Sequence, residues 1–162
     1  ENFEILQKNT SQFKNIEAFN VGLGAKNGSF KVYLSDDNEN YGGVSFYSEV
    51  EGNLSEPFSE CEVKNVNDIL KDLGINKVDL IKIDTEGAEY DILTSIKSEF
   101  LEKTSWITGE LHGNRDFELL NYLNSLGFSI SLNKNIDNRL FMFNAGKQEV
   151  VSKLSRREIK IL

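Results

Sequence analysis

An apolar run from Val78 to Ile83 leads directly into a short segment that holds four carboxylates around one glycine, Gly87. The four acids are Asp84, Glu86, Glu89 and Asp91. Apolar residues at both odd and even positions are typical of a strand that helices bury on two faces. In a parallel sheet such a strand ends at the carboxyl edge, where these folds bind ligands. Asp84 is therefore expected to end a strand on the ligand-binding edge, where stability does not require a carboxylate.

A second polar pair ends the next apolar segment, "SWITGELHG", from Ser105 to Gly113. Glu110 and His112 are two residues apart, so in a strand both side chains point to the same face. If the two strands are neighbours, Asp84, Glu110 and His112 converge on one small volume. His112 is the only histidine of the chain and is suited to accept a proton near neutral pH, although a hydrogen-bonded strand-end histidine explains it equally well.

Two further interpretations of these acids stay open. Asp84, Glu110 and His112 are acceptable metal ligands, but two carboxylates and one imidazole often meet by accident, so no metal is predicted. Glu86 and Glu89 are expected in the first turn of the following helix. For Glu89 and Asp91 we favour a structural role, because carboxylates near a helix N-terminus interact favourably with the helix dipole.

The rest of the chain alternates between strand and helix patterns, which predicts an α/β domain with a largely parallel sheet. Asn27-Gly28 predicts a hairpin turn, and Asn67 is expected to cap a helix. Ser155 and Glu158 have the spacing of a capping box and predict a terminal helix. Helices are predicted near 3–13, 66–75, 88–96 and 117–126, and strands near 15–24, 30–34, 44–50, 78–83, 105–113, 128–134 and 139–146.

Composition excludes some classes of protein. The formal net charge of −8 argues against nucleic-acid binding and against an anionic membrane surface. No apolar stretch approaches the length of a membrane span. Cys61 is the only cysteine, so the chain forms no internal disulfide, which is compatible with the cytoplasmic location that we predict.

The segment "VDLIKIDTEGAEYDILTSI", followed by "WITGELHG", resembles the FkbM-type S-adenosylmethionine-dependent methyltransferases. The signature of that family is an apolar strand that runs into Lys-Ile-Asp, one variable residue and Glu-Gly-Ala-Glu, which the segment from Lys82 to Glu89 matches in register. The resemblance extends from Glu1 to about Gly146 and is looser outside the signature.

The resemblance implies a doubly wound, mostly parallel sheet of the Rossmann-like class I methyltransferases. It also implies methyl transfer from S-adenosylmethionine to a hydroxyl of a sugar, a glycan or a polyketide-like small molecule. Asp84 would lie beside both the methyl donor and the acceptor, and Glu110 and His112 would face the acceptor. His112 and Asp84 are the candidates for removing the acceptor proton, and Glu86 is expected to contact the acceptor.

The family's glycine-rich first turn and the acid after its second strand have no counterpart in this sequence. Only Asn20, Val21 and Gly22 then remain for the adenine side of the cofactor. We therefore expect an N-terminally incomplete methyltransferase domain over residues 1–146 and a helical tail over 147–162. The family's third and fourth strands should then be unable to pair, and the isolated chain should be inactive and either poorly stable or a homo-oligomer.

Two loops, Asp36–Gly43 and Asn133–Asn138, are expected to shape the acceptor pocket. The alternative function is that of a non-catalytic domain of the same fold that binds a glycan or a protein partner.

Overall fold

The computed structural model describes residues 2–34, 44–45, 59–112, 114–134 and 141–154. Six helices and eight strands lie within these residues. The helices are α1 (Asn2–Thr10), α2 (Val66–Asp72), α3 (Glu89–Ser95), α4 (Ser98–Lys103), α5 (Asp116–Ser125) and α6 (Gln148–Leu154). The strands are β1 (Gly22–Gly24), β2 (Gly28–Leu34), β3 (Val44–Ser45), β4 (Ser59–Asn65), β5 (Leu80–Ile83), β6 (Trp106–Leu111), β7 (Phe128–Lys134) and β8 (Phe141–Lys147).

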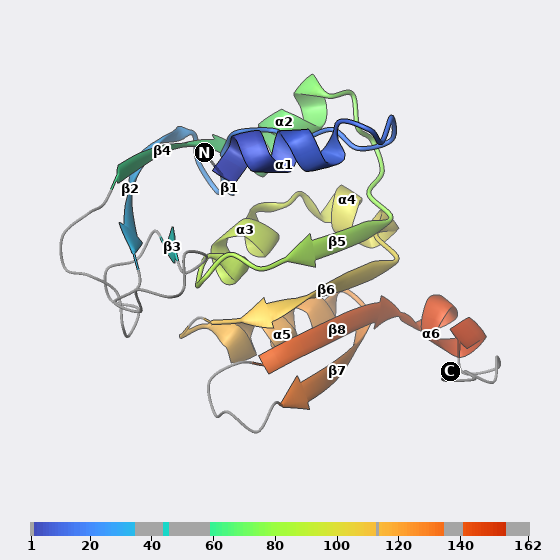
Figure 1. Cartoon of the computed structure of the whole chain (residues 1–162). Helices are drawn as coiled ribbons and strands as arrows, with labels where there is room; N and C mark the ends of the chain where they lie inside the picture. Colours follow the sequence, from blue (N-terminus) through green and yellow to red (C-terminus); the bar gives the residue numbers. More distant parts are fainter. Residues whose placement is uncertain (1, 35–43, 46–58, 113, 135–140, 155–162) are drawn as a thin grey trace.

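The strands form two separate four-stranded sheets (Figure 1). The first sheet has the order β1-β4-β2-β3 and the second has the order β5-β6-β8-β7. β1 and β5 correspond to the third and fourth strands of the family resemblance, and they lie in different sheets, as expected.

The predicted α/β class is present, but the expected mostly parallel sheet is not confirmed in the described residues: both sheets are mixed, and only the pairs β1–β4 and β5–β6 are parallel. In the second sheet β8 lies between β6 and β7 and pairs antiparallel with both. The short connection from Lys134 to Phe141 explains this reversal, since a parallel pair needs a longer crossover between its strands. β5, β6 and β7 therefore run in one direction and β8 runs against them.

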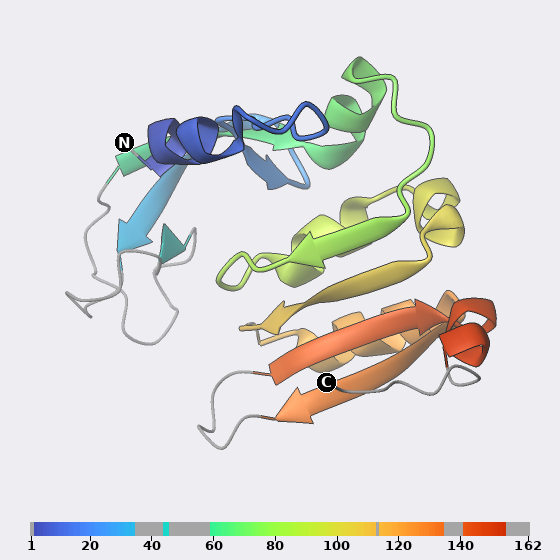
Figure 2. The same ribbon diagram turned by 45° about the vertical axis from the view of Figure 1, so that its right-hand side comes forward.

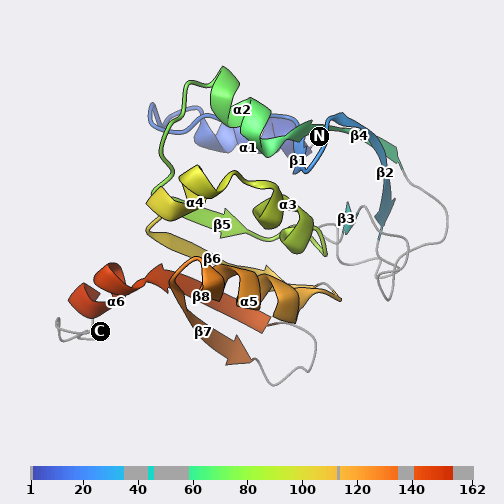
Figure 3. The same ribbon diagram turned by 180° about the vertical axis from the view of Figure 1, so that it is seen from behind.

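The doubly wound arrangement is also not seen, because α3, α4 and α5 cover one and the same face of the second sheet (Figure 3). On the other face, Leu80 of β5 is 58% exposed. The prediction that this strand is buried on two faces is thus wrong, and its side chains alternate between covered and exposed positions. Figure 2 shows the uncovered side of the same sheet, with α6 at its end.

The hydrophobic core lies between the second sheet and its helices. Ala88, Ile92, Leu93 and Ile96 form a buried stripe along α3. Phe117, near the start of α5, is 78% exposed. The fully buried side chains of this core include Leu93, Leu101, Ile107, Leu119, Leu123 and Phe143.

Two helices end as local chemistry dictates, whereas two local predictions are wrong. Gly74 and Gly127 end α2 and α5 with positive φ angles of 66° and 83°, as expected for glycine after a helix. The predicted hairpin at Asn27-Gly28 is wrong, because β4 separates β1 from β2. The cap of α2 is Asn65 and not Asn67, since the Asn65 side chain accepts a hydrogen bond from the Asn67 amide at 2.8 Å.

Asn67 instead links α2 to the end of α3. Its side chain donates to the Ser95 carbonyl oxygen at 2.8 Å and accepts from the Lys97 amide at 2.9 Å. At the C-terminal end α6 is present, whereas the predicted capping box at Ser155 and Glu158 lies outside the described residues. No helix within the described ranges is long and apolar enough to cross a membrane.

Candidate active site

The loop between β5 and α3 carries the first acidic residues. β5 ends at Ile83 and α3 begins at Glu89, so Asp84 follows the strand directly, as predicted. Glu86 has a φ angle of 51°, the only positive φ of a non-glycine residue in the described part of the chain, and Gly87 follows with 109°. The prediction that Glu86 lies in the first helical turn is therefore wrong. A left-handed φ is uncommon outside glycine, and here it turns the chain sharply before the helix.

Glu89 is the centre of this loop, because its buried carboxylate accepts hydrogen bonds from several donors. The side chain is 1% exposed. Its oxygens accept from the amide of Thr85 at 3.0 Å, from the Thr85 hydroxyl at 3.2 Å and from the amide of Gly87 at 3.1 Å. The carboxylate thus fixes the loop that holds Asp84 and Glu86.

From the sequence we expected Glu89 only to interact with the dipole of its helix, and we did not predict that its carboxylate binds the preceding loop. One signal in the sequence points to it. Glu89 shares the helical spacing of Ile92, Leu93 and Ile96, which form the buried stripe of α3. A carboxylate on the buried face of a helix requires partners, and the chain supplies them from the preceding loop and from the next strand.

That next strand contributes His112, which follows β6 directly. β5 and β6 pair in parallel, with Ile83 opposite Gly109, so their carboxyl ends reach the same edge. The His112 side chain is only 8% exposed and its Nδ1 lies 3.2 Å from Glu89 Oε1. Because a carboxylate only accepts hydrogen bonds, Nδ1 carries the proton of this contact, and Nε2 is directed toward the other acids.

The close approach of the two strands at this edge requires glycine at position 109. A Cβ atom there would lie 2.1 Å from the Ile83 carbonyl oxygen and 2.7 Å from Ile83 Cγ2. Gly109 therefore lets β5 and β6 end side by side next to the acidic residues.

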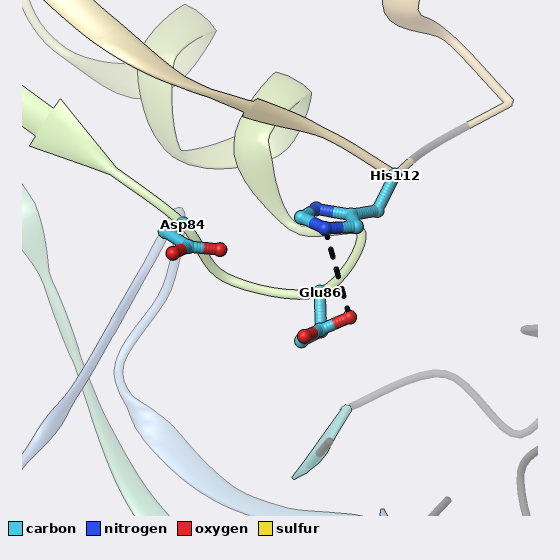
Figure 4. Close-up of side chains that lie close together, drawn as sticks. All are labelled: Asp84, Glu86 and His112. Carbon is cyan, nitrogen blue, oxygen red and sulfur yellow. Dashed lines mark ion pairs between the residues drawn. The ribbon is translucent and has the colours of Figure 1, made fainter. Parts of the chain in front are cut away.

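Acidic side chains lie around the imidazole of His112, two of them next to Nε2. Glu110 Oε2 lies 3.5 Å away and Glu86 Oε2 lies 3.8 Å away. One ligand atom each of Asp84, Glu86 and His112 lies within 4.8 Å of the others (Figure 4). The predicted convergence is therefore present only in part: Asp84 meets His112 together with Glu86, whereas Glu110 contacts His112 Nε2 and does not belong to this group of ligand atoms in the described residues.

The electrostatics of the site follow from these contacts. The hydrogen bond to Glu89 raises the pKa of His112 above its ordinary value; burial opposes this, and the charges of Glu86, Glu89 and Asp84 support it. Burial alone would raise the pKa of Glu89, but the hydrogen bond from His112 and backbone amides outweigh it, so this pKa lies below its usual value. The site therefore favours a positive charge beside its carboxylates.

Asp84 has one further partner, since Lys82 Nζ lies 3.2 Å from its Oδ2. This lysine is largely exposed, so the pair is held weakly. The arrangement offers a cation-attracting edge, an oriented imidazole and carboxylates within reach of a small polar ligand.

Of the three residues predicted to contact the adenine side, only Gly22 lies in a strand. Gly22 is the first residue of β1, and Asn20 and Val21 precede it. They are thus at the amino end of this strand. β1 packs against α3, the helix that follows the acidic loop.

The loops predicted to shape the acceptor pocket fall largely outside the described residues. Residues 36–43 are not described, and of 133–138 only Asn133 and Lys134 are described, at the end of β7. The role of these loops stays a prediction.

Comparison with known proteins agrees with the signature around Asp84. No solved structure matches the chain. Over 88 residues, 52% of this chain, it is 28% identical to the AMB antimetabolite synthetase AmbE of Pseudomonas aeruginosa. The chain spans only 4% of the length of that protein. The family model of the methyltransferase FkbM domain matches residues 1–130, and the chain therefore belongs to the FkbM methyltransferase family.

Proposed function

We propose that this chain is part of an S-adenosylmethionine-dependent O-methyltransferase that acts on a hydroxyl of a sugar, a glycan or a polyketide-like small molecule. One observation carries the proposal: in an FkbM-family chain, Asp84, Glu86, Glu110 and His112 meet at the shared carboxyl edge of β5 and β6. That edge is the ligand-binding side of parallel strands.

The charge of this edge fits the proposed cofactor. S-adenosylmethionine carries a sulfonium cation and supplies an electrophilic methyl group. The carboxylates of Asp84, Glu86 and Glu110 are partly exposed and attract a cation. Asn20, Val21 and Gly22 stay the contacts that the family resemblance implies for the adenine side, and they lie at the amino end of β1.

The same edge can position the acceptor hydroxyl. Methyl transfer is an in-line displacement, so holding the two reactants in line supplies much of the rate. The hydroxyl proton leaves as the new carbon–oxygen bond forms, and His112 and Asp84 are the two candidates to accept it. Glu86 and Glu110 border His112 Nε2 and are proposed to contact the acceptor.

The similarity to AmbE favours a small-molecule acceptor, since AmbE is an antimetabolite synthetase. A cytoplasmic location and a homo-oligomeric state are further proposals, and the binding of a glycan or protein partner without catalysis is the alternative.

Calorimetric titration of the protein with S-adenosylmethionine tests the proposal. We expect saturable binding, followed by transfer of a labelled methyl group to members of a panel of hydroxyl compounds. Loss of the proton acceptor should lower kcat by about 10²–10⁴-fold, so Asp84→Asn and His112→Gln are compared with Asp79→Asn at the opposite end of β5. Absence of both binding heat and a thermal shift would favour the non-catalytic domain.

A further inference from the structure

We propose that Asp84, Glu86 and His112 bind one divalent cation of the first transition series, through one oxygen of each carboxylate and Nε2 of the imidazole. These three ligand atoms lie within 4.8 Å of one another (Figure 4). Carboxylates and imidazole together suit ions such as Mn²⁺, Fe²⁺ and Zn²⁺. The set differs from the combination of Asp84, Glu110 and His112 considered from the sequence, because the turn at Glu86 brings this side chain to the site.

The spacing is close to that of a coordinated ion. Ligand atoms at about 2.0–2.2 Å from a metal are roughly 3–4.4 Å apart, depending on the angle between them. Glu86 Oε2 and His112 Nε2 are already 3.8 Å apart. Asp84 and Glu86 are partly exposed, so small side-chain rotations can close the remaining few tenths of an ångström.

His112 distinguishes this site from an ordinary solvated acidic surface. Its side chain is only 8% exposed. Even so, the carboxylate oxygens nearest to Nε2 lie 3.5 and 3.8 Å away, which is longer than an N–H···O hydrogen bond of about 2.7–3.2 Å. The other ring nitrogen is held by the buried carboxylate of Glu89 at 3.2 Å. Metal-binding histidines almost always have such a partner on the second nitrogen, which fixes the ring toward the ion.

The charge balance around the site also favours a bound cation. Glu86 and Glu110 border Nε2, and Asp84 pairs with Lys82, whose Nζ lies 3.2 Å from Asp84 Oδ2 and which is largely exposed. Displacing a mobile lysine from a solvated pair has a small cost. Asp79, at the other end of β5, differs from Asp84 in both respects. Its Oδ1 lies 2.5 Å from Lys77 Nζ, and within the described residues it belongs to no group of side chains that could hold a metal.

A cation at this position would also take part in the proposed methyl transfer. Only that catalytic role of the ion rests on the proposed function. A bound metal ion lowers the pKa of a coordinated hydroxyl and orients it. His112 Nε2 would then serve as a ligand, and a nitrogen that binds a metal does not also accept the acceptor proton. The binding of the ion itself requires no methyl transfer.

Titration with Mn²⁺ alone, without cofactor or acceptor, tests the site. Electron paramagnetic resonance should show one saturable site per chain, with a coupling to ¹⁴N from the imidazole. His112→Gln should abolish the ¹⁴N coupling, and Asp84→Asn should raise the Kd at least about tenfold. Glu89→Gln should weaken binding by roughly 10–100-fold through misorientation of the ring, whereas Asp79→Asn should leave the Kd unchanged. Circular dichroism of each variant checks that it is folded.

Three outcomes would overturn the proposal: no saturable Mn²⁺ binding, binding without ¹⁴N coupling, or an equal loss of affinity in Asp79→Asn. The proposed function fails separately. Methyl transfer that persists unchanged with a chelator would overturn only the role of the ion in the reaction, whereas Mn²⁺ binding with nitrogen coupling in a protein that does not bind S-adenosylmethionine would overturn the methyltransferase proposal alone.

Discussion

The two sheets bury their apolar residues to very different extents. In the second sheet Phe143 is fully buried, and the same is true of Ile107 and Leu119. In the first sheet Val32 and Val63 are buried, but Phe30 is 41% exposed. In the segment that leads into this sheet, Phe19 is 44% exposed and no residue of α1 is buried. The acidic cluster is built on the sheet with the packed core, where the side chains have well-defined positions.

The two sheets also differ in how they are held. The second sheet is stabilised by a continuous apolar core, whereas the first is fixed at its end by polar contacts. Asn27 donates to Asp68 at 2.7 Å and accepts from the Asn65 amide at 2.6 Å. Hydrogen bonds contribute about 0.5–1.5 kcal/mol each, less than the burial of a large side chain. The first sheet should therefore open before the second.

Truncation of one phenylalanine in each region gives the largest contrast. Phe143→Ala should lower the free energy of unfolding by about 3–5 kcal/mol, because it leaves a cavity in a closed core. Phe19→Ala removes a half-exposed ring and should change this free energy by less than about 0.5 kcal/mol. Urea denaturation followed by circular dichroism measures both. A similar loss in the two variants would contradict the contrast between the regions.

The next contrast compares a buried with an exposed carboxylate. Glu89→Gln should cost about 1.5–3 kcal/mol, since the hydrogen bonds of Glu89 join a charged group to an imidazole and two amides. Glu60 in the first sheet also accepts a hydrogen bond, from Ser29 at 3.0 Å, but it is exposed. Glu60→Gln is thus the matched control and should leave the urea midpoint almost unchanged.

Glu89 also shows where the sequence was insufficient. The signature predicts the positions of Asp84 and His112, because strand periodicity and the parallel β5–β6 pair place their ends at one edge. The left-handed turn at Glu86 had no local signal, since such a φ depends on contacts that over-determine it. The contact between Glu89 and His112 joins residues 23 positions apart, and periodicity alone does not specify it.

The sequence predicts individual helices and strands better than it predicts which strands pair with one another. Helix ends at Gly74 and Gly127 follow from local chemistry. The position of β4 between β1 and β2, and of β8 between β6 and β7, depends on long-range pairing, which local turn signals such as Asn27-Gly28 do not determine.

A glycine in each sheet tests how closely the strands must approach. Gly109→Ala should cost about 1–3 kcal/mol through overpacking, because its Cβ would meet the backbone oxygen of Ile83 at 2.1 Å. At Gly28 the nearest atom to an added Cβ is Phe30 Cε2 at 3.1 Å, in a side chain that can move. Gly28→Ala should therefore cost less, and thermal unfolding of both variants measures the difference. An equal loss would mean that β5 and β6 can separate without penalty.

The smallest effect that we expect is a pH dependence of stability that arises in the second sheet alone. His112 has a raised pKa in the folded protein, so its contribution is fully present below its unfolded pKa of about 6.5 and is lost as the pH rises through the folded pKa. The lowered pKa of Glu89 matters at acidic pH. The contribution of Glu89 to stability is present above its unfolded pKa of about 4.3 and is lost as the pH falls through its pKa in the folded protein.

The Tm measured with a chelator should accordingly fall as the pH rises from about 6.5 toward 8, by the linkage of His112 protonation to folding. His112 is the only histidine, so few other groups titrate in this range. His112→Gln should flatten the dependence, while Phe19→Ala, with the same histidine and a change in the other region, should keep it. A wild-type Tm that rises over this range would show that the contact with Glu89 does not favour the protonated imidazole.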